Sequence, residues 1–347
     1  MIQSAREDAD DDFIGCGPWI VQRANFKFSG RTVSDELNGF HAGRLKKTHR
    51  DAEKDIGCGG FGRSRWDLRL GLRKTSTLAI TKLRMTNHEA RFGGILRLYG
   101  SDGQERLRRA HVCVVGIGGV GSWAVEALAR SGVGKLTLVD MDDVCISNVN
   151  RQIHAATGTF GKPKVEAMAE RVQLINPDCK VRAEQIFFTA TTAEQLLAPG
   201  YDAVLDAIDS REMKALLIAM CRAKKIPVVT TGGAGGRRDP TALRVADLAQ
   251  ATHCGLLVNL RKLLRTEHNF PRDLQQPFGV DCVFSPEPQV YPAGDGTICD
   301  VKPPGERLRL DCRTGYGTAC FVTGAFGFAA AGQVVKRITA GESCASG

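Results

Sequence analysis

The sequence has no pair of cysteines separated by two residues, although twelve cysteines occur among its 347 residues. Structural zinc sites are commonly built on such pairs, so we expect no zinc site. A disulfide framework is not indicated either, because these frameworks belong mainly to small secreted domains and the chain shows no secretory signal. Most of the cysteines are therefore expected to be small core residues or unreactive thiols.

Long runs without charge are also scarce. The run Tyr316–Val335 has no charged residue and is just long enough to cross a bilayer. It is rich in glycine and has few large aliphatic side chains. Because small residues let helices approach closely, we expect a core or dimer-interface helix here, in a soluble, cytoplasmic protein.

The composition is that of an ordinary globular protein, with 43% hydrophobic and 24% charged residues. The formal net charge of +9 is compatible with a polyanionic partner such as nucleic acid. A basic protein without such a partner is an equal alternative.

Residues 1–84 differ from the rest of the chain. They contain an acidic cluster at 8–12 and recurring Arg and Lys from Arg44 to Arg84, without sustained apolar periodicity. The early acids argue against a targeting peptide, and an RNA-binding arm is an open alternative. We expect a disordered leader or a mis-assigned start, with the folded domain beginning at Met85.

The stretch from His111 to Arg151 predicts a nucleotide-binding βαβ unit. The apolar run Val112–Val115 suits a buried strand, and Lys135–Val139 suits a second one that ends at Asp140. The turn between the first strand and the following helix carries four glycines that let the backbone approach a phosphate, namely Gly116, Gly118, Gly119 and Gly121. An acid at the end of the second strand is placed to bind a ribose. Alone, this pattern also fits a nicotinamide-dependent dehydrogenase.

Polar residues after Asp140 favour ATP instead. Arg151 and Lys164 are directed at the same nucleotide in this interpretation, and two cations suit a triphosphate that must be neutralised while it reacts. A nicotinamide cofactor needs no such cluster. The other polar residues expected at the nucleotide are Asp142, Asn148, Asn150 and Gln152.

Further along, helical and strand patterns alternate, which predicts an α/β fold with a doubly wound, mostly parallel sheet and helices on both faces. We expect helices at 164–175, 192–197 and 213–223, and strands at 181–187, 203–206 and 226–230.

Asp209 follows the end of a strand, where such sheets bind ligands, and suits magnesium. For Asp206, a helix cap or a loop hydrogen bond is an equal alternative. Residues 85–240 form the expected ATP-binding domain, and 241–340 continue it.

A basic segment follows the second glycine-rich turn at 232–236. A leucine stripe from Leu256 to Leu264 predicts an amphipathic helix, which is either a solvated surface helix or a phosphate-tracking surface for nucleic acid. The basic residues of the segment are Arg237, Arg238, Arg244, Arg261, Lys262, Arg265 and Arg272.

Several ordered motifs carry a family resemblance: GIGGVG, LVDMDDV, SNVNRQ, GKPK and DAIDS. Together they resemble the E1-like (ThiF/MoeB/HesA-type) adenylyltransferases over most of residues 91–240. From about Arg91 to Arg337, the chain looks like the tRNA threonylcarbamoyladenosine dehydratase branch of that superfamily, through RFGG, RLYG, VTTGGAGG, FGVDCVFSPEPQVYP and DCRTGYGTACFVTGAFGF.

The resemblance implies an ATP- and Mg²⁺-dependent cyclisation of N6-threonylcarbamoyladenosine at position 37 of tRNA, with loss of water. It assigns Arg151 and Lys164 to the phosphates, Asp209 to Mg²⁺ and Asp140 to the ribose. The implied partners are tRNA rather than DNA, a second subunit that receives Arg91 or Arg97, and a cysteine desulfurase with its sulfur-acceptor protein. For the two arginines, a solvated helix face is an equal alternative. A sulfur-carrier adenylyltransferase of the thiamine or molybdopterin type is the alternative.

Cys282 is a candidate catalytic residue, because some E1-like enzymes form a thioester or a persulfide. It lies in an expected loop-to-strand segment beside Asp281. A neighbouring carboxylate raises the pKa of a thiol and so disfavours the reactive thiolate. A packed or redox-sensitive thiol is therefore the favoured alternative.

Overall fold

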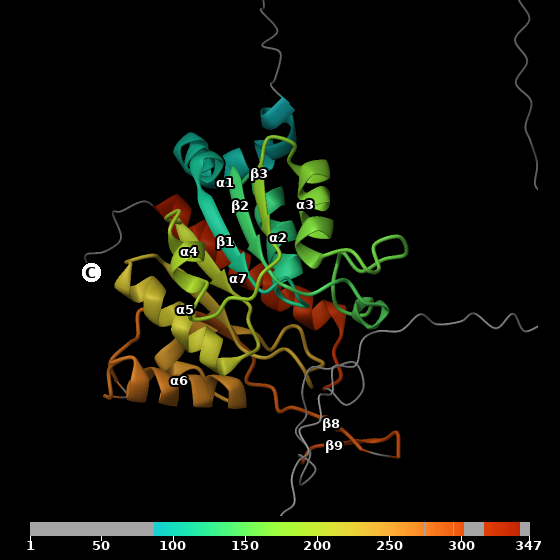
Figure 1. The fold of residues 1–347 in the computed structure, drawn as a ribbon, viewed down its shortest axis with the longest axis vertical. Coiled ribbons are helices and arrows are strands. Elements are labelled where there is room, and N and C mark those ends of the chain that lie inside the picture. Colours follow the sequence, from blue (N-terminus) through green and yellow to red (C-terminus); the bar gives the residue numbers. More distant parts are fainter. Residues whose placement is uncertain (1–86, 274, 294, 302–315, 341–347) are drawn as a thin grey trace, which may run out of the picture. The chain divides into compact units, whose positions relative to one another are not determined.

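The computed structural model describes residues 87–340, without 274, 294 and 302–315 (Figure 1). The chain divides into two units, Met1–Leu78 and Ala79–Gly347, and every described residue belongs to the second. The expectations for residues 1–84, including the leader and the start at Met85, lie outside the described range.

A seven-stranded sheet with the order β3-β2-β1-β4-β5-β7-β6 forms the centre of the fold. Neighbouring strands are parallel except β6, which is antiparallel to β7. This confirms the predicted mostly parallel α/β fold. The strands are β1 (His111–Val115), β2 (Lys135–Val139), β3 (Lys180–Glu184), β4 (Ala203–Asp206), β5 (Val228–Thr231), β6 (Arg244–Asp247) and β7 (Asp281–Phe284), and a separate hairpin holds β8 (Tyr291–Pro292) and β9 (Ile298–Cys299).

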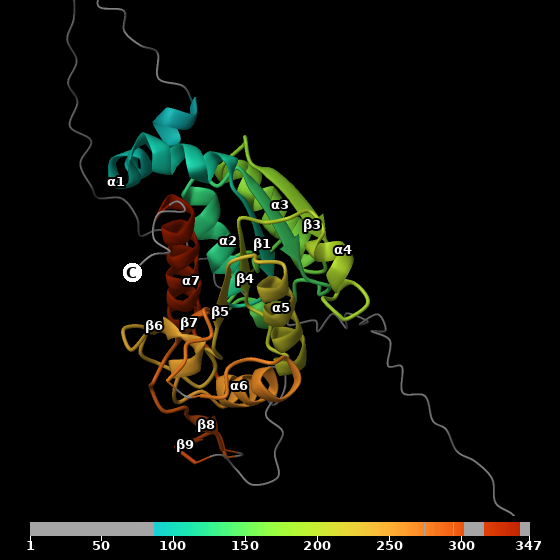
Figure 2. The same ribbon diagram turned by 90° about the vertical axis from the view of Figure 1, so that its left-hand side faces the viewer.

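Helices cover both faces of the sheet, and α7 and α5 lie on opposite sides of it (Figure 2). In β1, Val112 and Val114 pack in one core cluster with α2, α3 and α7, while Cys113 and Val115 pack in the other with α4, α5 and α6. Alternate strand residues thus fill two separate cores. The helices are α1 (Asn87–Arg109), α2 (Gly121–Arg130), α3 (Lys164–Ile175), α4 (Ala193–Leu197), α5 (Arg211–Ala223), α6 (Gly255–Glu267) and α7 (Cys320–Ala340), with short 3-10 turns η1 (Ile146–Asn148) and η2 (Leu248–Gln250).

Most predicted elements are found, and β2, α3 and β4 have the expected bounds. The third strand is shorter than predicted, since β3 ends at Glu184 instead of Phe187. Glu184 pairs with Val139, the last residue of β2. Beyond this pair the edge strand has no neighbour, and Phe187 is exposed. The length of β3 is therefore set by its partner strand.

The run predicted to be a core helix is α7. Its residues Val322, Phe326 and Val334 are fully buried in the core that also contains α2. A Cβ atom on Gly327 would lie 2.6 Å from the carbonyl oxygen of Val120, so only glycine permits this close approach of α7 to α2. Among the helices of the described range, α7 included, none has the length and apolar character that a membrane span requires.

The glycine turn between β1 and α2 is equally tight, and this predicts a large effect of one methyl group. A Cβ atom on Gly121 would lie 1.8 Å from the carbonyl oxygen of Gly116. We expect Gly121→Ala to lower the free energy of unfolding by about 3 kcal/mol, the upper range for overpacking, as measured by urea denaturation. Gly118→Ala is the matched control, because a Cβ atom there meets nothing within 4 Å. Equal stability of the two variants would contradict this geometry.

Candidate nucleotide-binding site

The glycine turn places the amino end of α2 at the carboxyl edge of the sheet. Gly116 has a φ of +90°, and its backbone packs against the Ala207 carbonyl, because a Cβ atom would lie 2.7 Å from that oxygen. The N-cap of α2, Val120, offers no side-chain hydrogen bond to the first turn. Free backbone N–H groups at a helix start are a ready site for a phosphate.

The ends of β2 and α3 bring Asp140, Asp142 and Lys164 together. The Asp140 carboxylate accepts hydrogen bonds from the Ile117 N–H (2.6 Å) and the Asp142 N–H (2.9 Å). The Lys164 ammonium is buried, 2.7 Å from a carboxylate oxygen of Asp142 and 4.0 Å from one of Asp140. Burial raises the pKa of Asp140, and the charge of Lys164 opposes that shift. Asp140 thus fixes the glycine turn and holds a cation beside it.

Arg151 lies beside the same turn. A Cβ atom on Gly119 would be 3.6 Å from Cγ of Arg151. The Arg151 guanidinium donates to the carbonyl of Ser147 (2.6 Å) and to Oδ1 of Asn150 (3.1 Å). Asn148 is buried in η1, and its Oδ1 accepts from the N–H of Cys145 at 3.1 Å. The structure therefore brings the predicted glycines, Arg151 and Asn148 into one region, with Asn148 shaping the loop that carries Arg151.

Gln152 is also buried, and its Oε1 atom accepts no hydrogen bond from the residues that the structure describes. A buried amide oxygen without a partner is uncommon. This acceptor lies next to Arg151 in the chain and remains available to a ligand or a water molecule.

Asp206 and Asp209, which sequence analysis treated together, have different surroundings. Asp206 is completely buried and forms an ion pair with Lys214 of α5 at 2.9 Å. Thr230 of β5 donates to the same carboxylate at 2.7 Å, and the Ile208 N–H donates to its other oxygen at 3.1 Å. Asp209 is exposed at the amino end of α5. Of the alternatives expected for Asp206, the loop hydrogen bond is present, through the Ile208 N–H, whereas the cap of α5 is Ser210. The ion pair with Lys214 was not expected, and Asp209 faces the solvent.

Lys214 is the important residue that sequence analysis missed. A lysine in an amphipathic helix normally belongs to the solvated face. Here Lys214 is spaced three, four and seven residues from Leu217, Ile218 and Cys221, all of which are fully buried. That helical spacing was the available signal, because it places the lysine on the apolar face.

Cys282 lies inside β7 and is completely buried. Burial raises the pKa of its thiol well above the ordinary range, despite the opposing charge of Lys214. The neighbouring Asp281 is paired with Arg337 at 2.5 Å. These surroundings favour the packed thiol over a nucleophile, which needs access and a thiolate.

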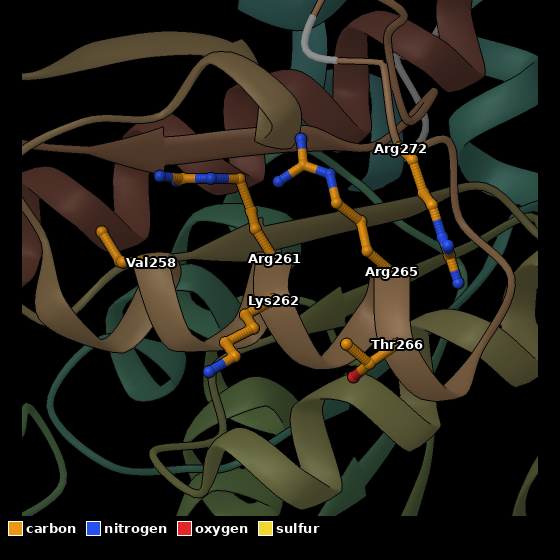
Figure 3. Close-up of a pocket in the computed structure, with 6 residues that line it drawn as sticks. All are labelled: Val258, Arg261, Lys262, Arg265, Thr266 and Arg272. Carbon is orange, nitrogen blue, oxygen red and sulfur yellow. The ribbon is translucent and has the colours of Figure 1, made fainter.

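The basic segment forms a cavity of about 410 Å³ along α6, lined by Val258, Arg261, Lys262, Arg265, Thr266 and Arg272. Arg261 and Arg265 extend to one side of the helix and Lys262 to the other (Figure 3). Arg261 donates to the Ala251 carbonyl, and Arg265 donates to the Pro271 carbonyl at 3.0 Å. Lys262 and Arg272 form no hydrogen bond or ion pair with the described residues.

The prediction was wrong for Arg237, which was grouped with this basic segment. Arg237 is only 2% exposed, and its guanidinium donates to the carbonyls of Gly233 (2.8 Å), His253 (3.0 Å) and Ser285 (3.2 Å). These bonds hold the second glycine-rich turn in place. Arg237 is therefore a buried structural residue, since carbonyl oxygens accept from both of its terminal guanidinium nitrogens.

Metal ligands are sparse in this region. Within the described ranges, no group of three or more His, Cys, Asp and Glu side chains is arranged to hold a metal ion. A metal at this site would therefore need oxygen atoms from a bound ligand in addition to protein carboxylates.

Comparison with known proteins supports the geometry. The family model described as "ThiF family" matches residues 93–344. The chain is 51% identical over 251 residues to the tRNA threonylcarbamoyladenosine dehydratase of Escherichia coli (strain K12), which covers 72% of this chain and 94% of that protein. It is 48% identical over 256 residues to the dehydratase of the same name from Haemophilus influenzae, covering 74% and 95%.

A solved structure agrees with both matches. The crystal structure of the E. coli enzyme in complex with ATP superimposes with a TM-score of 0.64 and 47% identity, over 73% of this chain and 95% of that one. The similarity therefore extends over nearly the whole of each relative.

The buried ion pair gives a prediction about stability. Replacing Lys214 with Met leaves the Asp206 carboxylate buried without its partner, which typically costs about 3–5 kcal/mol. We expect that loss in urea denaturation, and substantial recovery in the double variant Asp206→Asn/Lys214→Met. Lys224→Met is the control, at the residue that follows the last turn of α5, because Lys224 pairs with an exposed Glu194 and such pairs contribute about 1 kcal/mol or less. Similar losses in the two lysine variants would contradict the assigned role.

Proposed function

The chain belongs to the ThiF family, and we propose that it catalyses the ATP-dependent dehydration of N6-threonylcarbamoyladenosine at position 37 of tRNA. The observation that carries this proposal is the 51% identity to a dehydratase of that name over 94% of the relative's length. The proposal is also supported by the glycine turn with Arg151 and Lys164 beside it, and by a relative of 47% identity that is described in complex with ATP.

The chemistry requires a better leaving group, because hydroxide leaves a carboxylate poorly. The substrate carboxylate attacks the α-phosphate of ATP, and pyrophosphate leaves. A nucleophilic atom of the same substituent then attacks the adenylated carbonyl, closing a ring and releasing AMP, so that the lost water appears in the hydrolysed phosphate bond. Arg151, Lys164 and the N–H groups of α2 stabilise the charge that develops on the phosphates. Asp140 is placed to accept hydrogen bonds from the ribose.

Magnesium is part of the proposal through Asp209. Mg²⁺ prefers oxygen ligands and is usually bound by one or two carboxylates together with substrate phosphates. The Asp209 carboxylate is exposed after β4, near the glycine turn that abuts Ala207. It therefore fits a metal that arrives with the nucleotide.

Subunit contacts are also proposed. E1-like enzymes resembling this chain act as homodimers in which an arginine enters the partner's site. Arg91 already donates to the carbonyl of Ile175 in its own chain at 3.1 Å. Arg97 is exposed on α1 and forms no such bond with the described residues, so we favour Arg97 for this role. A cysteine desulfurase with its sulfur-acceptor protein, and a cytoplasmic location, remain predictions.

Two alternatives have less support. A sulfur-carrier adenylyltransferase would show pyrophosphate exchange that depends on a carrier protein and not on tRNA. A nicotinamide dehydrogenase would bind NAD and would need no cation such as Lys164 at the phosphates.

The decisive test is mass spectrometry of nucleosides after incubating the protein with modified tRNA, ATP and magnesium. We expect the threonylcarbamoyl nucleoside to lose one water, about 18 Da by reaction chemistry. Arg151→Ala and Lys164→Ala should each lower the rate by about 10²–10³, the usual effect of removing a group that stabilises transition-state charge.

Two controls accompany that test. Lys162→Ala removes a nearby exposed lysine that pairs with Glu170 and should leave the rate unchanged. Cys282→Ala should also remain active, because the packed thiol has no proposed chemical role. Full activity in both the Arg151 and Lys164 variants would reject this placement of the triphosphate.

A further prediction concerns the tRNA surface. Among the four basic residues that line the cavity along α6, we propose Lys262 and Arg272 as tRNA contacts, because the side chains of Arg261 and Arg265 donate to carbonyl oxygens of the fold. In the double variant Lys262→Glu/Arg272→Glu, tRNA binding should weaken, and the slope of log affinity against log salt should fall by about 0.7–0.9 for each lost phosphate contact. Titration of tRNA at two salt concentrations measures this. ATP affinity should not change.

The control for the surface is Lys336→Glu, since Lys336 is an exposed lysine on α7, away from α6. An unchanged salt slope in the double variant, or the same change in the control, would place the RNA surface elsewhere.

A further inference from the structure

The carbonyl oxygen of Arg151 accepts two side-chain hydrogen bonds from different helices. Trp123 of α2 donates through its indole Nε1 at 2.9 Å. Thr323 of α7 donates through its hydroxyl at 3.1 Å. Thr323 lies 172 residues from Arg151 in the sequence, so the loop that carries the proposed phosphate ligand is tied to the C-terminal helix.

Close packing of α7 on α2 makes this arrangement possible. A Cβ atom on Gly327 would lie 2.8 Å from Cβ of Trp123, and one on Gly324 would lie 3.5 Å from the indole ring. A Cβ atom on Gly119 would lie 3.3 Å from the methyl group of Thr323. The glycine turn, Trp123 and Thr323 therefore meet directly beside Arg151.

A second link joins the same loop to the segment just before α7. The Asn150 amide donates to the carbonyl of Thr318 at 2.8 Å and to its hydroxyl at 3.2 Å. Consecutive loop residues, Asn150 and Arg151, are thus held by residues at the amino end of α7. The conformation of this loop is therefore stabilised by contacts with a distant segment as well as by its own turns.

Thr323 has other acceptors, but they are farther away. Its hydroxyl is 3.3 Å from the Cys320 carbonyl and 3.4 Å from the Ala319 carbonyl, both in its own chain segment. A hydroxyl has a single proton to donate, and Thr323 is only 3% exposed. The shortest of the three contacts is the one to Arg151.

We propose that Trp123 and Thr323 are positioning residues that orient Arg151 toward the nucleotide phosphates. The two bonds fix the peptide plane after Arg151 and therefore the direction in which its side chain leaves the backbone. Among the described residues, the guanidinium itself donates to two acceptors of its own loop, Ser147 and Asn150. The position of Arg151 relative to α2 therefore depends on the hydrogen bonds that its carbonyl oxygen accepts from Trp123 and Thr323. This inference rests on the proposed function, because it assumes that Arg151 binds the triphosphate.

The test replaces Thr323 with Val, which keeps the shape and removes the donor. Misplacement of a catalytic group by about 1 Å can cost about 10² in rate, so we expect kcat for dehydration to fall between about 10- and 100-fold, with the KM for ATP changed less than about threefold. Thr323→Ser restores the donor and should restore most of kcat. Thr339→Val is the matched control on α7, because within the described part of the chain the Thr339 hydroxyl donates to carbonyls of its own helix, at 2.9 Å to Val335.

A spectroscopic measurement separates positioning from folding. The chain has three tryptophans, so full-length protein with Trp19→Phe and Trp66→Phe reports only on Trp123. Adding ATP without tRNA should change the Trp123 emission, because its indole shares an acceptor with Thr323 beside the nucleotide. In the Thr323→Val variant that change should differ in size. In kinetic measurements, Trp123→Phe should show the same loss of kcat. This variant replaces Thr323→Val as the test if Thr323→Val folds poorly.

The outcomes distinguish the two proposals. Normal kcat in both Thr323→Val and Trp123→Phe, with ATP bound, would overturn the positioning role and leave the dehydratase activity intact. Equal losses in Thr323→Val and Thr323→Ser would also overturn it, because the donor would then be irrelevant. If the unmodified protein binds no ATP by calorimetry, the proposed function fails, and this assignment fails with it.

Discussion

The carboxyl edge of the sheet depends on the ion pair between Asp206 and Lys214. Both side chains are completely buried, and an unpaired charge in that position would be strongly unfavourable. The pair joins the end of β4 to α5, and Thr230 adds β5 through its hydrogen bond. The next residue, Ala207, contacts the backbone of Gly116. The nucleotide turn thus rests on a loop that the buried pair holds in place.

The two cations proposed to bind the nucleotide, Lys164 and Arg151, have hydrogen-bond or ion-pair partners within the fold. Lys164 lies between two carboxylates, and the Arg151 guanidinium donates to oxygen atoms of its own loop. In the proposed function, the oxygen atoms of a triphosphate replace the present acceptors of Lys164 and Arg151. These donors are already oriented and partly removed from water. Such preorganisation is the main source of electrostatic stabilisation in enzyme sites, because little reorganisation is needed during the reaction.

Sequence patterns correctly predicted the bounds of elements whose ends are marked by nearby residues in the sequence. β2, α3 and β4 have their expected bounds because turn residues and proline mark them directly. The end of β3 was wrong because it depends on where β2 ends. Lys214 and Arg237 were misjudged for a common reason: charged residues normally face water, and only the fold reveals the carboxylate or carbonyl oxygens that satisfy them. The contact of Thr323 with Arg151 joins distant segments, so no local pattern indicates it.

The chemistry proposed for this site matches what its residues offer. Cyclisation needs an activated carbonyl and a nucleophile, and ATP and the substrate itself supply both. The protein then needs cations, backbone N–H groups and a fixed geometry. The described residues around the glycine turn provide these, while the one thiol considered as a nucleophile, Cys282, is buried in the sheet with a raised pKa. In the proposed mechanism the substrate supplies the nucleophile, so the orientation of the reacting groups is an important catalytic variable, because reacting groups within one molecule gain most from being held in line. The packing of α7 on α2 bears on that orientation through the hydrogen bonds that Trp123 and Thr323 donate to the Arg151 carbonyl.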